Sequence, residues 1–437
     1  MIGSGPAGAY AAEALVRLGD ATVDVLDRLP APFGLVRHGV APDHPKTQSI
    51  RTALAEIYRL PGINFVGNVA VGEDVTLDEL RATYDAVVVA FGAAVDRRMG
   101  VPGEDLPGSA SATDFVAWYT GHPDIPPQRF ELDARTVVVV GAGNVAGDVA
   151  RMLARTAEEL RDTDVPPEVL AAFARSQVRD IHLVARRGPA QARFTTRELR
   201  ELGELTDADV LVDPADLELD PVSERAVADQ PASRRNLDVL RGWARQAPAG
   251  RPRRVHLTFF RRPVAVLGTQ RVTGIRLERT RLDGGGELVA TGDLSDLPAE
   301  LVFRAVGYRS LPLPGLPFDE RAGVVPHLDG RVLTPGGPEP GLYVAGWAKR
   351  GPTGVIGTNK HDARETVRAL LADLASRAPF PDVGGVLPLL ARRGVRVVTW
   401  EGWLAIEAAE AAAGEVQGRR RATISDRAEL LRIAGAG

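Results

Sequence analysis

The sequence predicts an α/β protein that contains two three-layer domains, each built on a parallel sheet. A glycine-rich turn of the pattern G-x-G-x-x-[GA] occurs twice, at residues 3–8 and 141–146. A helical segment follows each turn, so that free N–H groups at the start of the helix can face a phosphate. The chain has 437 residues, which is too long for one compact core. These observations predict two Rossmann-like dinucleotide-binding domains.

The composition is that of a soluble globular protein, with 44% hydrophobic and 25% charged residues. The sequence has no apolar run of transmembrane length and no secretory signal, so a cytoplasmic location is expected. A net charge of −4 gives no reason to expect nucleic acid as a partner. The chain has no cysteine. This excludes a redox disulfide or an iron–sulfur cluster held by its own thiolates, and no metal site is predicted.

The first glycine turn stands at the start of the chain. The residues predicted to bind a dinucleotide there are Gly3, Gly5, Pro6, Ala7 and Gly8. Only Met1 and Ile2 precede them, whereas a buried strand normally runs about five or six residues. The first strand is therefore expected to be truncated. A helix is predicted over residues 7–18, with Gly19 as its C-cap.

An acidic residue closes the next predicted strand, residues 22–27. Asp27 stands 19 residues after Gly8, where a Rossmann-like domain holds the ribose hydroxyls of its nucleotide. The alternative is a surface aspartate that merely ends the strand. A long loop follows, residues 32–50, whose length is typical of a functional segment. It contains His38 and His44, which either take part in proton traffic or make structural hydrogen bonds.

The second domain begins with a complete strand, residues 137–140. The residues predicted to bind the second nucleotide at its turn are Gly141, Gly143, Asn144, Val145 and Ala146. Alanine is permitted at the third position of the fingerprint, which needs only close packing between helix and strand. A long helical stretch with an insertion, residues 149–175, delays the next strand to residues 181–185.

That next strand ends in Arg186 and Arg187 rather than in an acid. Two guanidinium groups can bind a 2′-phosphate, which an acid would repel, so the sequence favours NADPH over NADH. The alternative is a solvated basic strand end. A helix is predicted over residues 194–205, begun by Thr195 or Thr196. Its acids Glu198 and Glu201 lie three residues apart, a spacing also typical of ordinary surface charge.

Nine arginines occur between residues 234 and 262. If they form one patch, they would steer an acidic protein partner, and this effect would weaken as salt rises. Scattered solvated arginines are the alternative.

Several sequence blocks resemble the adrenodoxin-reductase type of NADPH:ferredoxin reductase, especially its actinobacterial members. The main block is G-L-V-R-x-G-V-A-P-D-H-P-K at residues 34–46, and further matches are GSGPAG, GNVAGDVAR, RRGP and GPTGVIGTNK. The resemblance covers roughly residues 2 to 372. It implies a glutathione-reductase-like fold, FAD and NADPH as cofactors, and a ferredoxin as electron acceptor.

The resemblance also implies roles for single residues. His44 would lie near the flavin ring and the nicotinamide, Glu201 would hydrogen-bond there with it, and Glu198 would belong to the NADP site. The remaining residues implied at the FAD site are Gly34, Leu35, Gly92, Gly346, Trp347, Gly354, Val355, Ile356 and Thr358. The segment 354–358 is expected to open the last helix of the flavin domain.

The expected domains follow from these blocks. The FAD-binding domain is expected in two parts, residues 1–103 and 309–380, with the NADPH-binding domain between them at 104–308. Residues 381–437 form a C-terminal extension, expected to pack against the flavin domain.

The function favoured by the sequence is hydride transfer from NADPH to FAD, followed by single-electron transfer to a ferredoxin-type iron–sulfur protein. One alternative is an NADPH diaphorase, oxidase or quinone reductase with the same cofactors. A second is a flavin-free NADPH-binding protein, because the truncated first strand weakens the first site.

Overall fold

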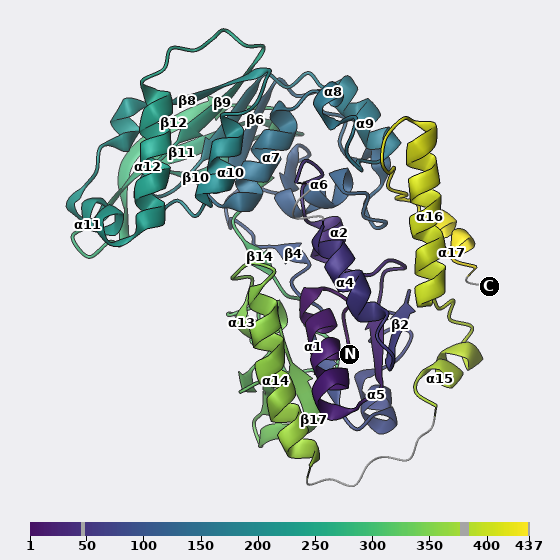
Figure 1. Cartoon of the computed structure of the whole chain (residues 1–437). Helices are drawn as coiled ribbons and strands as arrows, with labels where there is room; N and C mark the ends of the chain where they lie inside the picture. Colours follow the sequence, from purple (N-terminus) through teal and green to yellow (C-terminus); the bar gives the residue numbers. More distant parts are fainter. Residues whose placement is uncertain (45–48, 376–383, 436–437) are drawn as a thin grey trace. The chain divides into compact units, whose positions relative to one another are not determined.

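The computed structural model describes residues 1–44, 49–375 and 384–435. These residues form two compact units (Figure 1). The first unit comprises residues 1–95, 120–126 and 308–437, and the second comprises 96–119 and 127–307. The chain changes unit after Val95 rather than after residue 103, and residues 120–126 return to the first unit. The expected boundary between residues 380 and 381 lies outside the described part of the chain.

The sheet of the first unit has parallel strands at its centre and an antiparallel edge. Its order is β2, β1, Ile2, β3, β17, β16 and β15. The strand bounds are β1 Val23–Asp27, β2 Ile63–Gly67, β3 Val87–Val89, β15 His327–Leu328, β16 Arg331–Thr334 and β17 Gly337–Val344.

Ile2 joins the two halves of this sheet as a single bridged residue. It pairs in parallel with both Leu26 of β1 and Val89 of β3. Its N–H donates to Val88 O at 2.9 Å, and its carbonyl accepts from Ala90 N at 2.7 Å. The predicted truncated strand is therefore reduced to one bridge, yet it occupies the central position of the sheet.

Helices cover both faces of the first sheet. Alternate residues of its strands enter two apolar cores, with Val25 and Val88 in one and Leu26 and Val89 in the other. The first core also contains the tail residue Trp403. The main helices are α1 Pro6–Gly19, α2 Leu35–His38, α4 Ile50–Tyr58, α5 Leu77–Thr83, α13 Trp347–Arg350 and α14 Thr358–Leu374. The C-terminal extension adds α15 Leu387–Arg392, α16 Trp400–Val416 and α17 Arg427–Ile433.

The end of α1 differs from the expectation. Gly19 is the last residue of the helix, and the left-handed cap is Asp20, with φ of 48°. A Cβ at Gly19 would lie 2.5 Å from Leu371 Cδ2 of α14. The glycine is therefore required by the close packing of α1 against α14, and aspartate tolerates the left-handed conformation.

The second unit is built on a six-stranded parallel sheet of order β5, β13, β6, β7, β9 and β8. Its strands are β5 Ser109–Ser111, β6 Thr136–Val140, β7 Asp180–Val184, β8 Ala208–Val212, β9 Arg253–Thr258 and β13 Leu301–Arg304. An antiparallel sheet, β10 Arg261–Gly268, β11 Val272–Leu282 and β12 Leu288–Pro298, shares an apolar core with it. The short strands β4 Val95–Asp96 and β14 Tyr308–Arg309 lie in the sequence where the chain passes between units.

Helices of the second unit complete its layers. Helix α7 packs on β6, β7 and β9, and α12 packs on β8. The structure confirms the predicted insertion between α7 and β7. Helix α7 ends at Ala154, and two further short helices precede β7. The helices are α6 Ala112–Tyr119, α7 Asn144–Ala154, α8 Ala157–Leu160, α9 Pro167–Ala174, α10 Thr196–Leu202, α11 Pro221–Asp229 and α12 Pro231–Ala244. No helix among the described residues combines the length and apolar character that a membrane crossing needs.

Candidate functional site

The first glycine turn leaves its backbone open to a ligand. Gly3 has φ of +107°, and a Cβ there would lie 2.6 Å from Ala90 O. A Cβ at Gly8 would overlap Gly3 O, so no side chain fits at that position. Gly5, by contrast, has only Gly34 Cα near its Cβ position, at 4.0 Å. Gly5 is the N-cap of α1, so free N–H groups of the first helical turn are available to a pyrophosphate.

Asp27 fixes this turn. Its carboxylate accepts hydrogen bonds from the backbone N–H of Ser4 at 2.9 Å and from the Ser4 hydroxyl. The other oxygen accepts from Leu29 N at 2.9 Å. Burial raises the pKa of Asp27, although its hydrogen bonds oppose that shift. The carboxylate therefore supports the turn directly, and its contact with a ribose stays a prediction.

Two segments distant in the sequence meet at the first turn. Gly34 has φ of +51°, and its Cβ position is 3.2 Å from Gly5 Cα; Leu35 then begins α2. Gly346 has φ of +74°, and its Cβ position is 2.5 Å from Ala7 Cβ. Its N–H donates to the buried carboxylate of Asp362 at 2.5 Å. The backbones of residues 34 and 346 can approach the turn this closely only as glycine.

The residues predicted at the flavin after β17 differ in exposure: Gly354, Val355 and Thr358 are exposed, whereas Trp347 is half-buried. Trp347 begins α13, and its indole N–H donates to Thr353 O at 3.2 Å. Val355 is 69% exposed. Thr358 begins α14, as expected, and its hydroxyl accepts from Val355 N at 3.2 Å. Ile356 is half-buried, and Gly354 has φ of +82°.

Gly92 is a further open glycine of the first unit. It has φ of +75°, and no atom lies within 4 Å of its Cβ position. Its carbonyl accepts from the Ser310 hydroxyl at 2.7 Å, which fixes the turn after β3.

The second glycine turn has the same design with one difference. A Cβ at Gly141 would overlap Ala305 O, whereas nothing lies within 4 Å of the Cβ position of Gly143. Ala146 is fully buried and accommodated, unlike any side chain at the equivalent Gly8. Asn144 begins α7, and its side-chain oxygen accepts from Thr195 N at 2.8 Å. Val145 follows it in the first turn of the helix.

Arg186 and Arg187 follow β7 directly. Their backbone carbonyls are held, that of Arg186 by the Thr280 hydroxyl at 2.7 Å and that of Arg187 by Phe260 N at 3.2 Å. Arg186 is exposed and Arg187 is half-buried. Among the described residues, neither guanidinium has an ion pair with a carboxylate. The pair is therefore free to bind an anion.

Helix α10 brings both predicted acids to the second turn. Thr195 caps the helix, accepting from Glu198 N at 3.3 Å and donating to the Glu198 carboxylate at 2.9 Å. Glu201 lies between two arginines, Arg197 at 3.1 Å and the fully buried Arg151 at 3.6 Å. The second unit thus gathers its glycine turn, the acids of α10 and, after β7, the arginine pair.

Comparisons with known proteins identify this arrangement. The model of the pyridine nucleotide-disulphide oxidoreductase family matches residues 1–202. NADPH-ferredoxin reductase FprA of Mycobacterium tuberculosis is 45% identical, over 99% of this chain and 98% of that protein. NADPH:adrenodoxin oxidoreductase of Homo sapiens is 42% identical, over 100% of this chain and 91% of that protein. The structure of Mycobacterium tuberculosis FprA in complex with NADPH superposes with a TM-score of 0.93, covering 99% and 98% of the two chains.

The chain belongs to the family of NADPH-ferredoxin reductases and NADPH:adrenodoxin oxidoreductases. This confirms the family that the sequence blocks indicated, and the fold confirms two three-layer nucleotide-binding units. The wider family is named after a redox disulphide. This chain cannot form one, because it contains no cysteine.

The loop of the reductase that carries His44 is densely packed. His44 is 7% exposed, and its backbone N–H donates to Ala41 O at 3.0 Å. The ring centroids of His38 and His122 are 4.8 Å apart. Burial lowers the pKa of His38 well below its ordinary value and that of His122 to about 4. Both rings are therefore neutral at neutral pH, and neither fits a role in proton exchange near pH 7.

Aromatic side chains fasten the C-terminal extension of the reductase to the loops of the first site. Phe33, a buried residue with φ of +85°, packs edge-on against Trp403 at 5.7 Å. Tyr58 stacks on Trp400 at 5.4 Å, and its hydroxyl donates to Ser4 O at 2.8 Å. The extension therefore reaches the first glycine turn through one intervening ring, and it belongs to the same compact unit.

A buried ion pair completes this attachment. Arg37 of α2 and Glu410 of α16 lie 2.5 Å apart, with side chains 1% and 0% exposed. Glu410 also accepts from Ile424 N at 3.0 Å and faces Arg421 at 3.4 Å. Burial alone would raise the pKa of Glu410, but Arg37 and Arg421 outweigh burial and the pKa is lowered. The reductase thus keeps this carboxylate ionised.

Sequence reasoning missed Ser4, Tyr58, Asp362 and Glu410. Glu410 stands 373 residues from Arg37, in an alanine-rich stretch where a glutamate resembles ordinary helix-surface charge. No local spacing connects the two. For Asp362 a weak signal existed, since it follows the glycine-rich segment by one helical turn.

The arginine-rich segment does not act as one surface patch. Arg253 is 8% exposed and donates to Ala154 O and Val178 O. Arg254 pairs with Asp180, and Arg262 pairs with Glu278. The expectation of a single docking patch is therefore wrong for Arg253, which is buried. Arg254 and Arg262 each already have a carboxylate partner within the protein.

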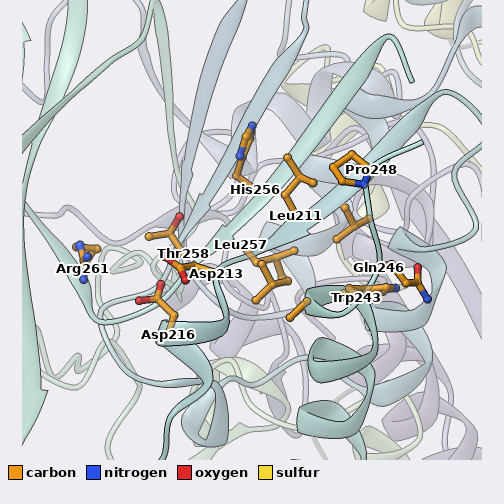
Figure 2. Close-up of a pocket in the computed structure, with 13 residues that line it drawn as sticks. Leu211, Asp213, Asp216, Trp243, Gln246, Pro248, His256, Leu257, Thr258 and Arg261 are labelled. Carbon is orange, nitrogen blue, oxygen red and sulfur yellow. The ribbon is translucent and has the colours of Figure 1, made fainter. Parts of the chain in front are cut away.

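A pocket of about 390 Å³ lies elsewhere in the second unit (Figure 2). Its walls come from the C-terminal parts of β8 and β9, the segment after β8, the end of α12 and Arg261. Burial raises the pKa of Asp216 in its wall, and that carboxylate accepts from Phe259 N at 2.9 Å. None of the residues predicted to bind a cofactor lines this pocket, so volume alone does not locate the nucleotide site.

The change Glu410→Ala should destabilise the reductase by about 3–5 kcal/mol, because it leaves the Arg37 charge buried without its main partner. Equilibrium denaturation of the FAD-loaded protein measures this, and the same preparation should release flavin faster. Glu56→Ala is the control, since the Arg59–Glu56 pair is exposed on both sides and should change stability by no more than about 0.5 kcal/mol. Equal effects of the two changes would contradict the importance of the buried pair.

Proposed function

We propose that this protein transfers electrons from NADPH through FAD to a ferredoxin-type iron–sulfur protein. The observation that carries this proposal is similarity over nearly the whole chain to NADPH-ferredoxin and NADPH:adrenodoxin reductases. Two open glycine turns support it, and so does the arginine pair that follows β7 in the second unit. The first unit takes FAD and the second takes NADPH.

The residues present fit both cofactors. Bound FAD would supply the conversion of a two-electron hydride donor into a source of single electrons. The chain's own task is orientation. Gly5 and Gly143 admit the two pyrophosphates close to the backbone, and Asp362 holds Gly346 in place beside Ala7. Because the chain has no cysteine, electrons leave the flavin without passing through a thiol of this protein.

Arg186 and Arg187 set the preference for NADPH by binding its 2′-phosphate. Both carry a permanent charge, and neither must first leave a carboxylate among the described residues. The carboxylate of Glu198 accepts a hydrogen bond from Thr195, the N-cap of α10. Glu198 belongs to this nucleotide site.

Replacing both residues, Arg186→Ala with Arg187→Ala, should remove about 3 kcal/mol or more of binding, which raises the KM for NADPH at least about 100-fold and leaves the KM for NADH unchanged. Each charge-assisted contact to phosphate is worth about 1.5–3 kcal/mol. Steady-state kinetics with the two coenzymes measure the ratio. The matched control is Arg271→Ala, an exposed arginine in the β10–β11 turn. A double variant that keeps its preference for NADPH would remove the pair from the site.

His44 and Glu201 order the nicotinamide and adjust the charge near the flavin ring. Neither needs to move a proton during hydride transfer. His44 is buried in the loop that follows Gly34 in the sequence. Glu201 is positioned by its ion pairs with Arg197 and Arg151. Such fixed side chains suit the ordering of a bound ring better than proton exchange with solvent.

The separate changes His44→Ala and Glu201→Ala should each slow flavin reduction by NADPH, by up to about 100-fold, because a small misplacement of reacting groups costs that much. Stopped-flow loss of flavin absorbance measures the step directly. Glu204→Ala, an exposed acid just beyond α10, should leave the rate unchanged. If both site variants reduce flavin at the parent rate, the assignment of these two residues fails.

The acceptor is tested by coupling NADPH oxidation to reduction of a small ferredoxin. We expect a yellow protein whose ferredoxin reduction saturates with ferredoxin and slows as salt rises. Quinones and dyes serve as competing acceptors in the same assay. A rate that is faster with quinone and unaffected by ferredoxin would favour the diaphorase or quinone reductase alternative, and a protein that retains no FAD would favour the flavin-free alternative.

The proposal includes a cytoplasmic location. Relatives with mycobacterial and with mitochondrial names occur in this family. Similarity to the bacterial NADPH-ferredoxin reductase of Mycobacterium tuberculosis supports this location.

A further inference from the structure

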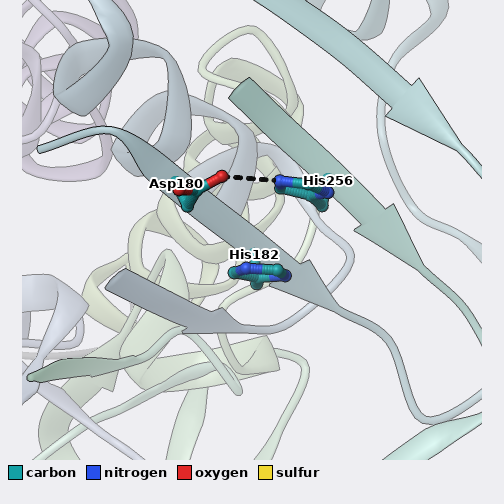
Figure 3. A group of neighbouring side chains, drawn as sticks. All are labelled: Asp180, His182 and His256. Carbon is teal, nitrogen blue, oxygen red and sulfur yellow. Dashed lines mark hydrogen bonds and ion pairs between the residues drawn. The ribbon is translucent and has the colours of Figure 1, made fainter. Parts of the chain in front are cut away.

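Three metal-ligating side chains meet on the sheet of the second unit, outside the residues assigned to the cofactors. They are Asp180 and His182 of β7 and His256 of β9 (Figure 3). One ligand atom from each lies within 4.8 Å of the others. Among the described residues, this is the one group of three such side chains.

Strand geometry explains the meeting. Asp180 and His182 are two residues apart, so they point to the same face of β7. β7 and β9 are parallel neighbours, and His182 is in register with His256. The buried Ile181 and Leu183 point to the opposite face. The three polar side chains therefore form a triangle that the sheet itself maintains.

The three side chains are half-buried. The side chains of Asp180 and His256 are 21% and 27% exposed, so an ion can reach them from solvent. The His182 and His256 rings are stacked, with centroids 4.2 Å apart and planes 8° apart. His256 Nε2 lies 3.0 Å from one oxygen of Asp180, and Arg254 binds the other at 2.7 Å. Arg254 thus orients the Asp180 carboxylate from outside the triangle of ligands. Its positive charge also repels a bound cation and so weakens binding.

The ligand set selects among cations. Two imidazoles and one carboxylate suit zinc, nickel or copper, whereas magnesium and calcium prefer oxygen ligands alone. No cysteine elsewhere in the chain competes for such an ion.

We infer that Asp180, His182 and His256 bind a divalent ion of the zinc type, which joins β7 to β9. Two ligands of one zinc ion lie at most about 4 Å apart, so the side chains must close slightly from their present positions. The two rings rotate out of their stack toward a common point, and the His256–Asp180 hydrogen bond is exchanged for bonds to the ion. Water completes the coordination.

This site is separate from the nucleotide site. His182 precedes Arg186 by four residues of extended chain, which span about 13 Å. The expected consequence of binding is therefore on the stability of the second unit and not on hydride transfer. An ion that binds only the folded state raises the unfolding temperature as its concentration rises.

The test uses the FAD-loaded, untagged protein after treatment with a chelator. Titration calorimetry with ZnCl₂ should find one equivalent bound by the parent, and thermal unfolding should shift upward with ZnCl₂. The changes His182→Asn and His256→Asn should each weaken binding at least tenfold and remove most of the thermal shift. His361→Asn removes an exposed histidine of α14 in the first unit and should behave as the parent.

A second measurement does not depend on how well the variants fold. Electron paramagnetic resonance of Cu²⁺ bound to the parent should show coupling to two imidazole nitrogens. NADPH-dependent flavin reduction should stay unchanged in the two variants, which separates this inference from the proposed function. The inference is overturned if the parent binds no zinc at micromolar concentration, if His361→Asn weakens binding as much as the other changes, or if copper couples to no imidazole.

Discussion

Close approach of backbone to backbone at a few glycines is the constraint on which the first unit depends. Gly3 lies against Ala90, Gly8 against Gly3, and Gly346 against Ala7. In each case a Cβ would fall inside van der Waals contact. These approaches bring the start of α1, the end of β3 and the start of α13 together and leave N–H groups free to bind phosphate. Larger side chains there would separate the segments that must converge on one cofactor.

Charge is treated differently at the two sites. In the first unit, three carboxylates have partners within the protein. Asp27 accepts from Ser4 of the turn, Asp362 accepts from Gly346, and Glu410 pairs with Arg37. In the second unit, the guanidinium groups of Arg186 and Arg187 have no carboxylate partner among the described residues. Internal pairs make a rigid frame, whereas free charges are available to a ligand. This division fits a tightly held flavin and an exchangeable coenzyme.

The C-terminal extension has a structural task within the frame. Its rings Trp400 and Trp403 contact Tyr58 and Phe33, and Glu410 neutralises Arg37 in a site closed to solvent. Phe33 holds a positive φ that is costly for an aromatic residue and persists only where its surroundings fix it. The extension supplies part of those surroundings, so the loop that leads to His44 depends on residues at the other end of the chain.

The sequence by itself determined the two glycine turns, the strands and helices that flank them, the arginine pair and the family. Those features are local, since each turn, its flanking elements and each of the separate blocks that indicate the family occupy fewer than about thirty consecutive residues. Only the tertiary structure decided that Ile2 alone completes a sheet, that Gly19 serves packing while Asp20 caps α1, and that Arg37 meets Glu410. It also decided that Asp180, His182 and His256 share one face of a sheet. Such pairings depend on strand order and long-range packing, which no spacing within the chain records.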